Sequence, residues 1–87
     1  MAESSGDFPS LLATLEGEMR RLETEFTQFF AGRRPRPPWE LRTRVRTLVQ
    51  QLDRLHVTNY GDRYRFSSLQ ARVMAMFGLW DRQLRAK

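Results

Sequence analysis

The sequence contains no cysteine, and His56 is the single histidine among its 87 residues. Without thiols the chain has neither disulfides nor thiolate metal ligands, and one imidazole cannot form a histidine metal cluster. We therefore expect no metal and no cofactor. The sequence also lacks a phosphate-binding glycine loop and a pair of carboxylates spaced to share one site. For these reasons we expect that the protein is not an enzyme.

Long hydrophobic runs are also absent. No apolar stretch approaches the roughly 20 residues that a transmembrane helix needs, so we expect no membrane insertion. Residues 1–7 are polar and acidic, without the basic and apolar regions of a signal peptide. Together with the absence of cysteine, this composition favours a cytoplasmic location.

Lysine is almost absent: Lys87 is the only lysine, and the other basic residues are arginines. The 15 lysine and arginine residues exceed the 10 aspartate and glutamate residues, which gives a net charge of +5. The charge is uneven along the chain. Residues 1–31 hold six acidic residues and two arginines (net −4), whereas residues 32–87 hold thirteen basic and four acidic residues (net +9). A basic surface attracts nucleic acid or another acidic partner. The alternative is that the acidic first segment neutralises the basic remainder within the fold.

What the sequence does contain is three stretches of helical periodicity. The first covers residues 7–31, where apolar residues repeat at spacings of 4 and 3, as in the a and d positions of heptads. These residues are Phe8, Leu12, Leu15, Met19, Leu22, Phe26 and Phe29. Asp7 is placed to cap the start of this helix and Gly32 to end it. We expect residues 1–6 to form a disordered tail.

Three prolines between residues 35 and 38 end the first stretch, because proline cannot continue a helix. The same 4,3 spacing returns in residues 38–55, at Leu41, Val45, Leu48, Leu52 and Leu55. Residues 56–66 contain asparagine, glycine and aspartate and are predicted to form a loop. A third helix is predicted over residues 67–86, with Ser67 and Gln70 as a capping box.

These patterns predict a single all-α domain over residues 7–87, either an antiparallel three-helix bundle or a helical hairpin with coiled-coil-like heptad packing. The strict heptad spacing also fits a coiled-coil oligomer. We expect an aromatic cluster at one end of the bundle, formed by Phe26, Phe29, Phe30, Trp39, Phe77 and Trp80. The helical pattern continues to Lys87, so we expect the chain to be part of a longer protein.

The back of the third helix carries small residues where a polar surface is usual. Ala71, Ala75 and Gly78 share this side, and Met74 and Leu79 flank them. Small residues let another helix approach closely, whereas glycine within a helix costs about 1 kcal/mol relative to alanine. We therefore expect a non-catalytic module that binds a protein partner or forms a homo-oligomer through these five residues. The alternative is that alanine is simply a good helix former on an exposed side.

Clustered arginines support a second hypothesis, a nucleic-acid-binding module, because guanidinium groups bind phosphates in pairs of hydrogen bonds. The arginines concerned are Arg33, Arg34, Arg36, Arg42, Arg46 and Arg65. The aromatic residues near Arg65 could stack on bases of a single strand. Alternatively, Tyr64 and Phe66 fill the open end of the bundle.

Overall fold

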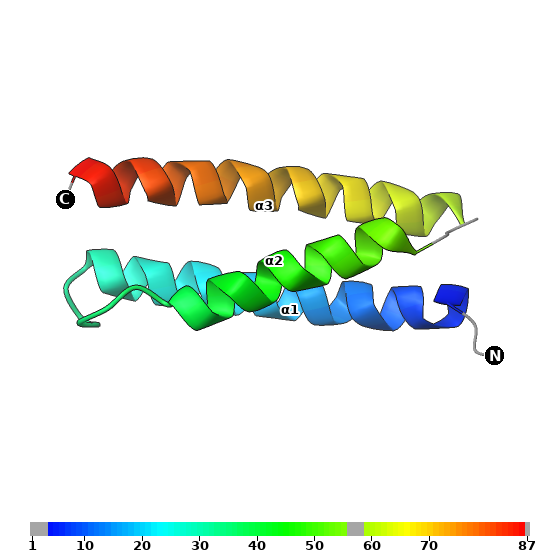
Figure 1. Cartoon of the computed structure of the whole chain (residues 1–87), viewed down its shortest axis with the longest axis horizontal. Helices are drawn as coiled ribbons and strands as arrows, with labels where there is room; N and C mark the ends of the chain where they lie inside the picture. Colours follow the sequence, from blue (N-terminus) through cyan, green and yellow to red (C-terminus); the bar gives the residue numbers. More distant parts are fainter. Residues whose placement is uncertain (1–3, 56–58, 87) are drawn as a thin grey trace.

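The computed structural model describes residues 4–55 and 59–86, and these form three helices. Helix α1 spans Ser4–Phe30, α2 spans Trp39–Arg54 and α3 spans Tyr60–Ala86. Successive helices run in opposite directions along a bundle of 46 × 19 × 16 Å (Figure 1). The prediction of an all-α antiparallel three-helix bundle is confirmed.

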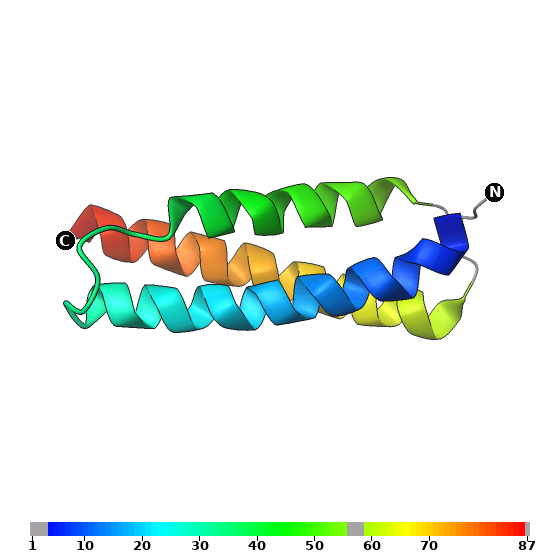
Figure 2. The same ribbon diagram turned by 90° about the horizontal axis from the view of Figure 1, so that it is seen from below.

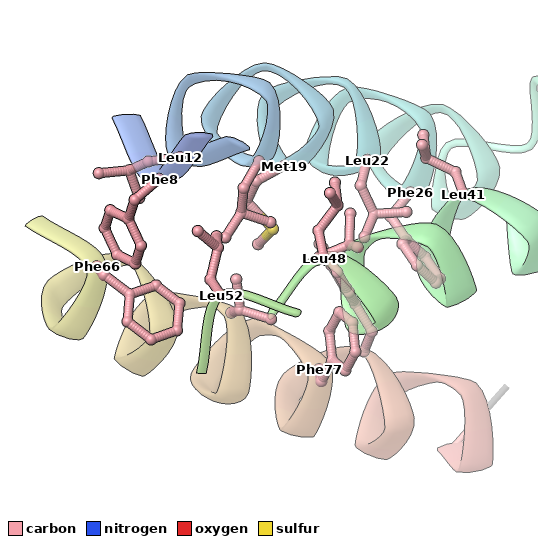
Figure 3. Packing of buried hydrophobic residues seen from close by; sticks show 14 of the residues in the cluster. Phe8, Leu12, Met19, Leu22, Phe26, Leu41, Leu48, Leu52, Phe66 and Phe77 are labelled. Atoms are coloured by element: carbon pink, nitrogen blue, oxygen red, sulfur yellow. The ribbon is translucent and has the colours of Figure 1, made fainter. Parts of the chain in front are cut away.

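The core consists of the heptad residues that the sequence singled out. All seven predicted a and d residues of α1 are buried, and so are Leu41, Val45, Leu48 and Leu52 of α2. Helix α1 packs against both other helices because its apolar stripe is wide enough to contact each of them. Figure 3 shows these side chains meeting along the axis of the bundle.

Aromatic pairs close the two ends of the core. At one end the rings of Phe26 and Trp80 stack with centroids 4.2 Å apart, and at the other Phe8 meets Phe66 edge to face at 5.9 Å. Trp39 does not join the first cluster as predicted, since 48% of its surface is exposed. The reason is its register: residues two apart point about 200° apart on a helix, so Trp39 faces away from the core when Leu41 faces inward.

The start of α3 differs most from the prediction. The helix begins at Tyr60 instead of Ser67, so residues 60–66 of the predicted loop are helical, while residues 56–58 lie outside the described residues. Ser67 lies exposed within the helix and not at its N-cap. Asn59 is the N-cap: its Oδ1 accepts a hydrogen bond from the backbone N–H of Asp62 at 3.0 Å. The cap, together with burial of Phe66, offsets the helix penalty of Gly61.

The first helix also begins earlier than predicted. Since α1 starts at Ser4, residues 4–6 are helical rather than part of a disordered tail, and Asp7 lies inside the helix rather than at its N-cap. Residues 1–3 lie outside the described residues. Pro9 therefore falls beyond the first turn, and Figure 2 shows the N-terminal turns of α1 bent relative to the rest of the helix. A proline inside a helix removes one backbone hydrogen bond and produces such a bend.

Helix α1 ends as its sequence predicts. Gly32 has a φ of 84°, which places it in the left-handed region that glycine adopts without strain. The N–H of Arg33 donates to the carbonyl of Gln28 at 2.9 Å, and the N–H of Gly32 donates to that of Phe29 at 3.0 Å. These two bonds form a Schellman motif, which turns the chain into the proline-rich connector, residues 31–38.

Candidate interaction surfaces

The outer face of α3 carries most of the large hydrophobic side chains that the described residues expose. We define the α3 outer face as Tyr60, Tyr64, Ala71, Met74, Ala75, Gly78 and Leu79. Tyr60 is 86% exposed, Tyr64 74%, Met74 65% and Leu79 37%. Apart from Trp39, these four are all the large hydrophobic side chains that the described part of the chain exposes.

Helical geometry places these residues on one continuous strip. At 100° per residue they fall within about 140° of the helix circumference, opposite buried Val73 and Trp80. Every position of the strip from Tyr60 to Leu79 is uncharged. The five residues singled out from the sequence therefore share one side of α3, on which Gly78 is partly buried and the other four are exposed.

Tyr60 and Tyr64 also belong to this face, although the sequence pattern did not indicate it. They were assigned to a loop because Asn59 and Gly61 resemble a turn. The spacing of residues 60, 64, 67, 71, 75 and 78 is helical throughout, and that periodicity is the signal that could have identified them.

Gly78 is not required by packing within the bundle. A Cβ atom built there would meet only the Nη1 atom of Arg82, at 3.8 Å, which is an ordinary van der Waals distance. The helix thus carries a residue of poor helix propensity on an open surface without an internal reason.

The six arginines of the nucleic-acid hypothesis do not form one surface. Arg65 lies near the start of α3 and binds Glu16 at 3.1 Å, whereas Arg42 lies near the start of α2, at the opposite end of the bundle. Arg42 binds Asp81 at 3.0 Å, and its guanidinium carbon lies 4.3 Å from the ring centroid of Phe77. The guanidinium carbon of Arg46 lies farther from the same ring centroid, at 6.0 Å. Arg42 therefore links α2 to α3 instead of facing solvent.

Arginines of α2 and α3 neutralise acidic residues of α1. Besides the Glu16 pair, Arg44 binds Glu18 at 3.0 Å and Arg72 binds Glu23 at 2.7 Å. This is the internal neutralisation that the sequence left open as an alternative. Arg33 and Arg36, both in the connector, make no ion pair with any described residue.

A cleft of about 590 Å³ lies between the end of α1, the connector and the first turn of α2. We name it the connector cleft and define it by Arg21, Arg34, Arg36, Trp39, Glu40 and Arg44, which are among its lining residues. Arg34 is held by Glu25 at 3.5 Å. Sequence analysis grouped Arg34 with Arg36 but missed Trp39, although its position off the heptad stripe already indicated exposure.

Among residues 4–55 and 59–86 no three His, Cys, Asp or Glu side chains converge as metal ligands. His56 falls outside the described residues, so its surroundings are undefined. No helix in the described part of the chain is long and apolar enough to cross a membrane.

The bundle therefore belongs to the broad class of all-α three-helix bundles with an unpartnered helix face. Comparison with protein-family models, curated proteins and solved structures finds no match to this chain.

Proposed function

We propose that the protein is a non-catalytic helical interaction module that packs the α3 outer face against a helix of another chain. The observation that carries this proposal is the concentration of exposed apolar side chains on one uncharged strip. Four of the five exposed large hydrophobic side chains among the described residues lie there. Exposed apolar side chains grouped on one side of a helix mark interaction sites more often than isolated hydrophobic residues do, although Ser67 and Ser68 separate Tyr64 from Ala71 on this strip.

A second copy of the chain is the partner that the face itself fits best. In an antiparallel pair centred near Val73, the alanines Ala71 and Ala75 meet at the crossing and let the helices approach closely. Tyr64 then lies level with Arg82 of the second copy, and Tyr60 with its Arg85. Each such pair places a guanidinium against an aromatic ring, a contact worth about 0.5–1 kcal/mol at exposed sites.

The test is sedimentation equilibrium of the protein over a hundred-fold concentration range, compared with Ala75→Glu. We expect the average mass to rise with concentration for the natural sequence and to stay monomeric for the variant. The same exchange at Ala13, an exposed alanine of α1, is the matched control and should leave association intact.

Two results would contradict self-association. A constant monomer mass at all concentrations would mean that the α3 outer face does not bind a second copy. The face would then have to bind a different protein, and the Ala75→Glu variant should fail to bind that protein in a capture assay. If Ala13→Glu and Ala75→Glu behaved alike in sedimentation equilibrium and in the capture assay, the α3 outer face would have no role in binding.

Salt separates this proposal from the nucleic-acid alternative. Association through apolar burial should persist at high salt, whereas binding to phosphates weakens steeply. The dispersed positions of Arg34, Arg42 and Arg65, each paired with a carboxylate, favour the interaction module. The cytoplasmic location stays a prediction.

A further inference from the structure

The connector cleft has the features of a ligand site that is separate from the α3 outer face. Its volume, about 590 Å³, falls within the range of small-molecule sites, and it lies where α1, the connector and α2 meet. Pro35, Pro37 and Pro38 line it and restrict the backbone, so little ordering is needed when a ligand binds.

Trp39 gives the cleft an aromatic surface. Trp39 is the first residue of α2, and its side chain is half exposed. The other tryptophan, Trp80, lies in the core and is 4% exposed. An exposed indole offers a planar aromatic face on which another ring can stack. The guanidinium carbon of Arg42 is 6.0 Å from the ring centroid of Trp39, at the limit of a cation–π contact.

The charge of the cleft is positive. Four arginines line it, at positions 21, 34, 36 and 44, against the two carboxylates of Glu25 and Glu40, and Arg44 also binds Glu18 outside the lining. Glu25 is shared by Arg21 at 3.1 Å and Arg34 at 3.5 Å, so its charge is more than balanced. Arg36 makes no ion pair with a described residue and is therefore free to bind an anion.

The start of α2 adds to this positive field. Its N-cap is Pro38, which has no side-chain cap, and the helix dipole places partial positive charge at this end. The cleft thus combines a planar aromatic surface with guanidinium groups that bind phosphate. Single-stranded nucleic acid offers the matching chemistry, since each unit has a base that stacks and a phosphate that accepts hydrogen bonds.

We propose that the connector cleft binds a nucleotide unit of single-stranded nucleic acid, with the base on Trp39 and the phosphate on Arg36. This site is narrower than the six-arginine surface expected from the sequence. It retains Arg34 and Arg36 and adds Trp39, Arg21 and Arg44. Arg42 and Arg65 are excluded because they do not line the cleft.

The experiment is a titration of a labelled, 5′-phosphorylated oligothymidine into the full chain, followed by anisotropy and by quenching of tryptophan fluorescence. We expect Trp39→Leu and Arg36→Gln each to weaken binding five-fold or more, and Trp39→Phe to restore most of the affinity. Arg54→Gln, which removes one exposed arginine from the far end of α2, is the charge-matched control and should change binding less than two-fold.

Further probes separate stacking from simple charge attraction. Inorganic polyphosphate and polyglutamate should bind at least ten-fold more weakly than the oligonucleotide. Equal binding of either polyanion would overturn the proposal, because it would mean that the cleft or the whole surface attracts anions without a base. Equal losses in Arg36→Gln and Arg54→Gln, or no quenching of Trp39, would overturn it as well. Ala75→Glu should leave oligonucleotide binding unchanged, because the α3 outer face lies elsewhere.

Discussion

Single side chains fix where the helices of this protein start and stop. Asn59 accepts a hydrogen bond from the N–H of Asp62 and so satisfies one of the unpaired donors at the start of α3. Gly32, at a φ of 84°, allows α1 to end without strain. Both residues act through the backbone, so their effects should be visible in stability without any change in the core.

Replacing Asn59 with alanine should therefore lower the free energy of unfolding by about 1 kcal/mol, the usual worth of an N-cap side chain. Denaturant titration followed by circular dichroism measures this change. Asn59→Asp keeps an acceptor oxygen and should remain close to the natural stability. An unaltered midpoint in Asn59→Ala would show that another residue sets the start of α3.

At the scale of the element, α1 and α3 differ in how much of their apolar surface is buried against the other helices of the bundle. Helix α1 buries a wide apolar stripe against both neighbours and presents its carboxylates to their arginines. Helix α3 buries a narrower stripe and leaves its opposite side apolar and uncovered. A helix with apolar residues on two sides is characteristic of packing between two partners, which is why we assign the association surface to α3.

Two glycines, one within α1 and one just after its end, allow a comparison of backbone effects. Gly17 lies within α1 with no atom within 4 Å of an added Cβ, so Gly17→Ala should stabilise the protein by about 0.5–1 kcal/mol. Gly32→Ala should destabilise it by a similar amount, about 1 kcal/mol, because alanine is strained at a φ of 84°. Thermal and denaturant unfolding of the two variants should shift in opposite directions. Shifts of the same sign would contradict this account.

At the scale of the whole molecule, the uneven charge of the sequence is partly resolved inside the bundle. Carboxylates of α1 bind arginines of α2 and α3 in exposed pairs such as Glu23 with Arg72. Each exposed pair contributes little, typically below about 1 kcal/mol, because solvent and salt screen it. Their combined effect is to orient the helices and to reduce the positive potential of the surface, which leaves the connector as the less neutralised region.

Charge reversal tests this arrangement. Glu23→Arg and Arg72→Glu should each destabilise the bundle, and the double variant should recover most of the loss, with a coupling energy below about 1 kcal/mol. Denaturant unfolding at low and at molar salt measures the coupling, which should disappear at high salt. Additive losses in the double variant at low salt would mean that the two side chains do not interact.

The sequence by itself determined the helical class and the buried face of α1 and α2, because apolar residues at heptad spacing can share one side only in a helix. It also determined the end of α1 at Gly32, since proline follows and glycine alone adopts a positive φ without strain. Local periodicity and local backbone chemistry are sufficient for these features.

The tertiary structure alone decided three other features. The start of α3 at Tyr60 depends on a cap and on distant burial of Phe66 against Phe8, which outweigh the local turn signal of Asn59 and Gly61. The partners of the arginines depend on which helices meet, because ion pairs such as Arg65 with Glu16 join residues far apart in the chain. The connector cleft depends on how the end of α1, the connector and the start of α2 come together, and no local pattern in the sequence records the space between them.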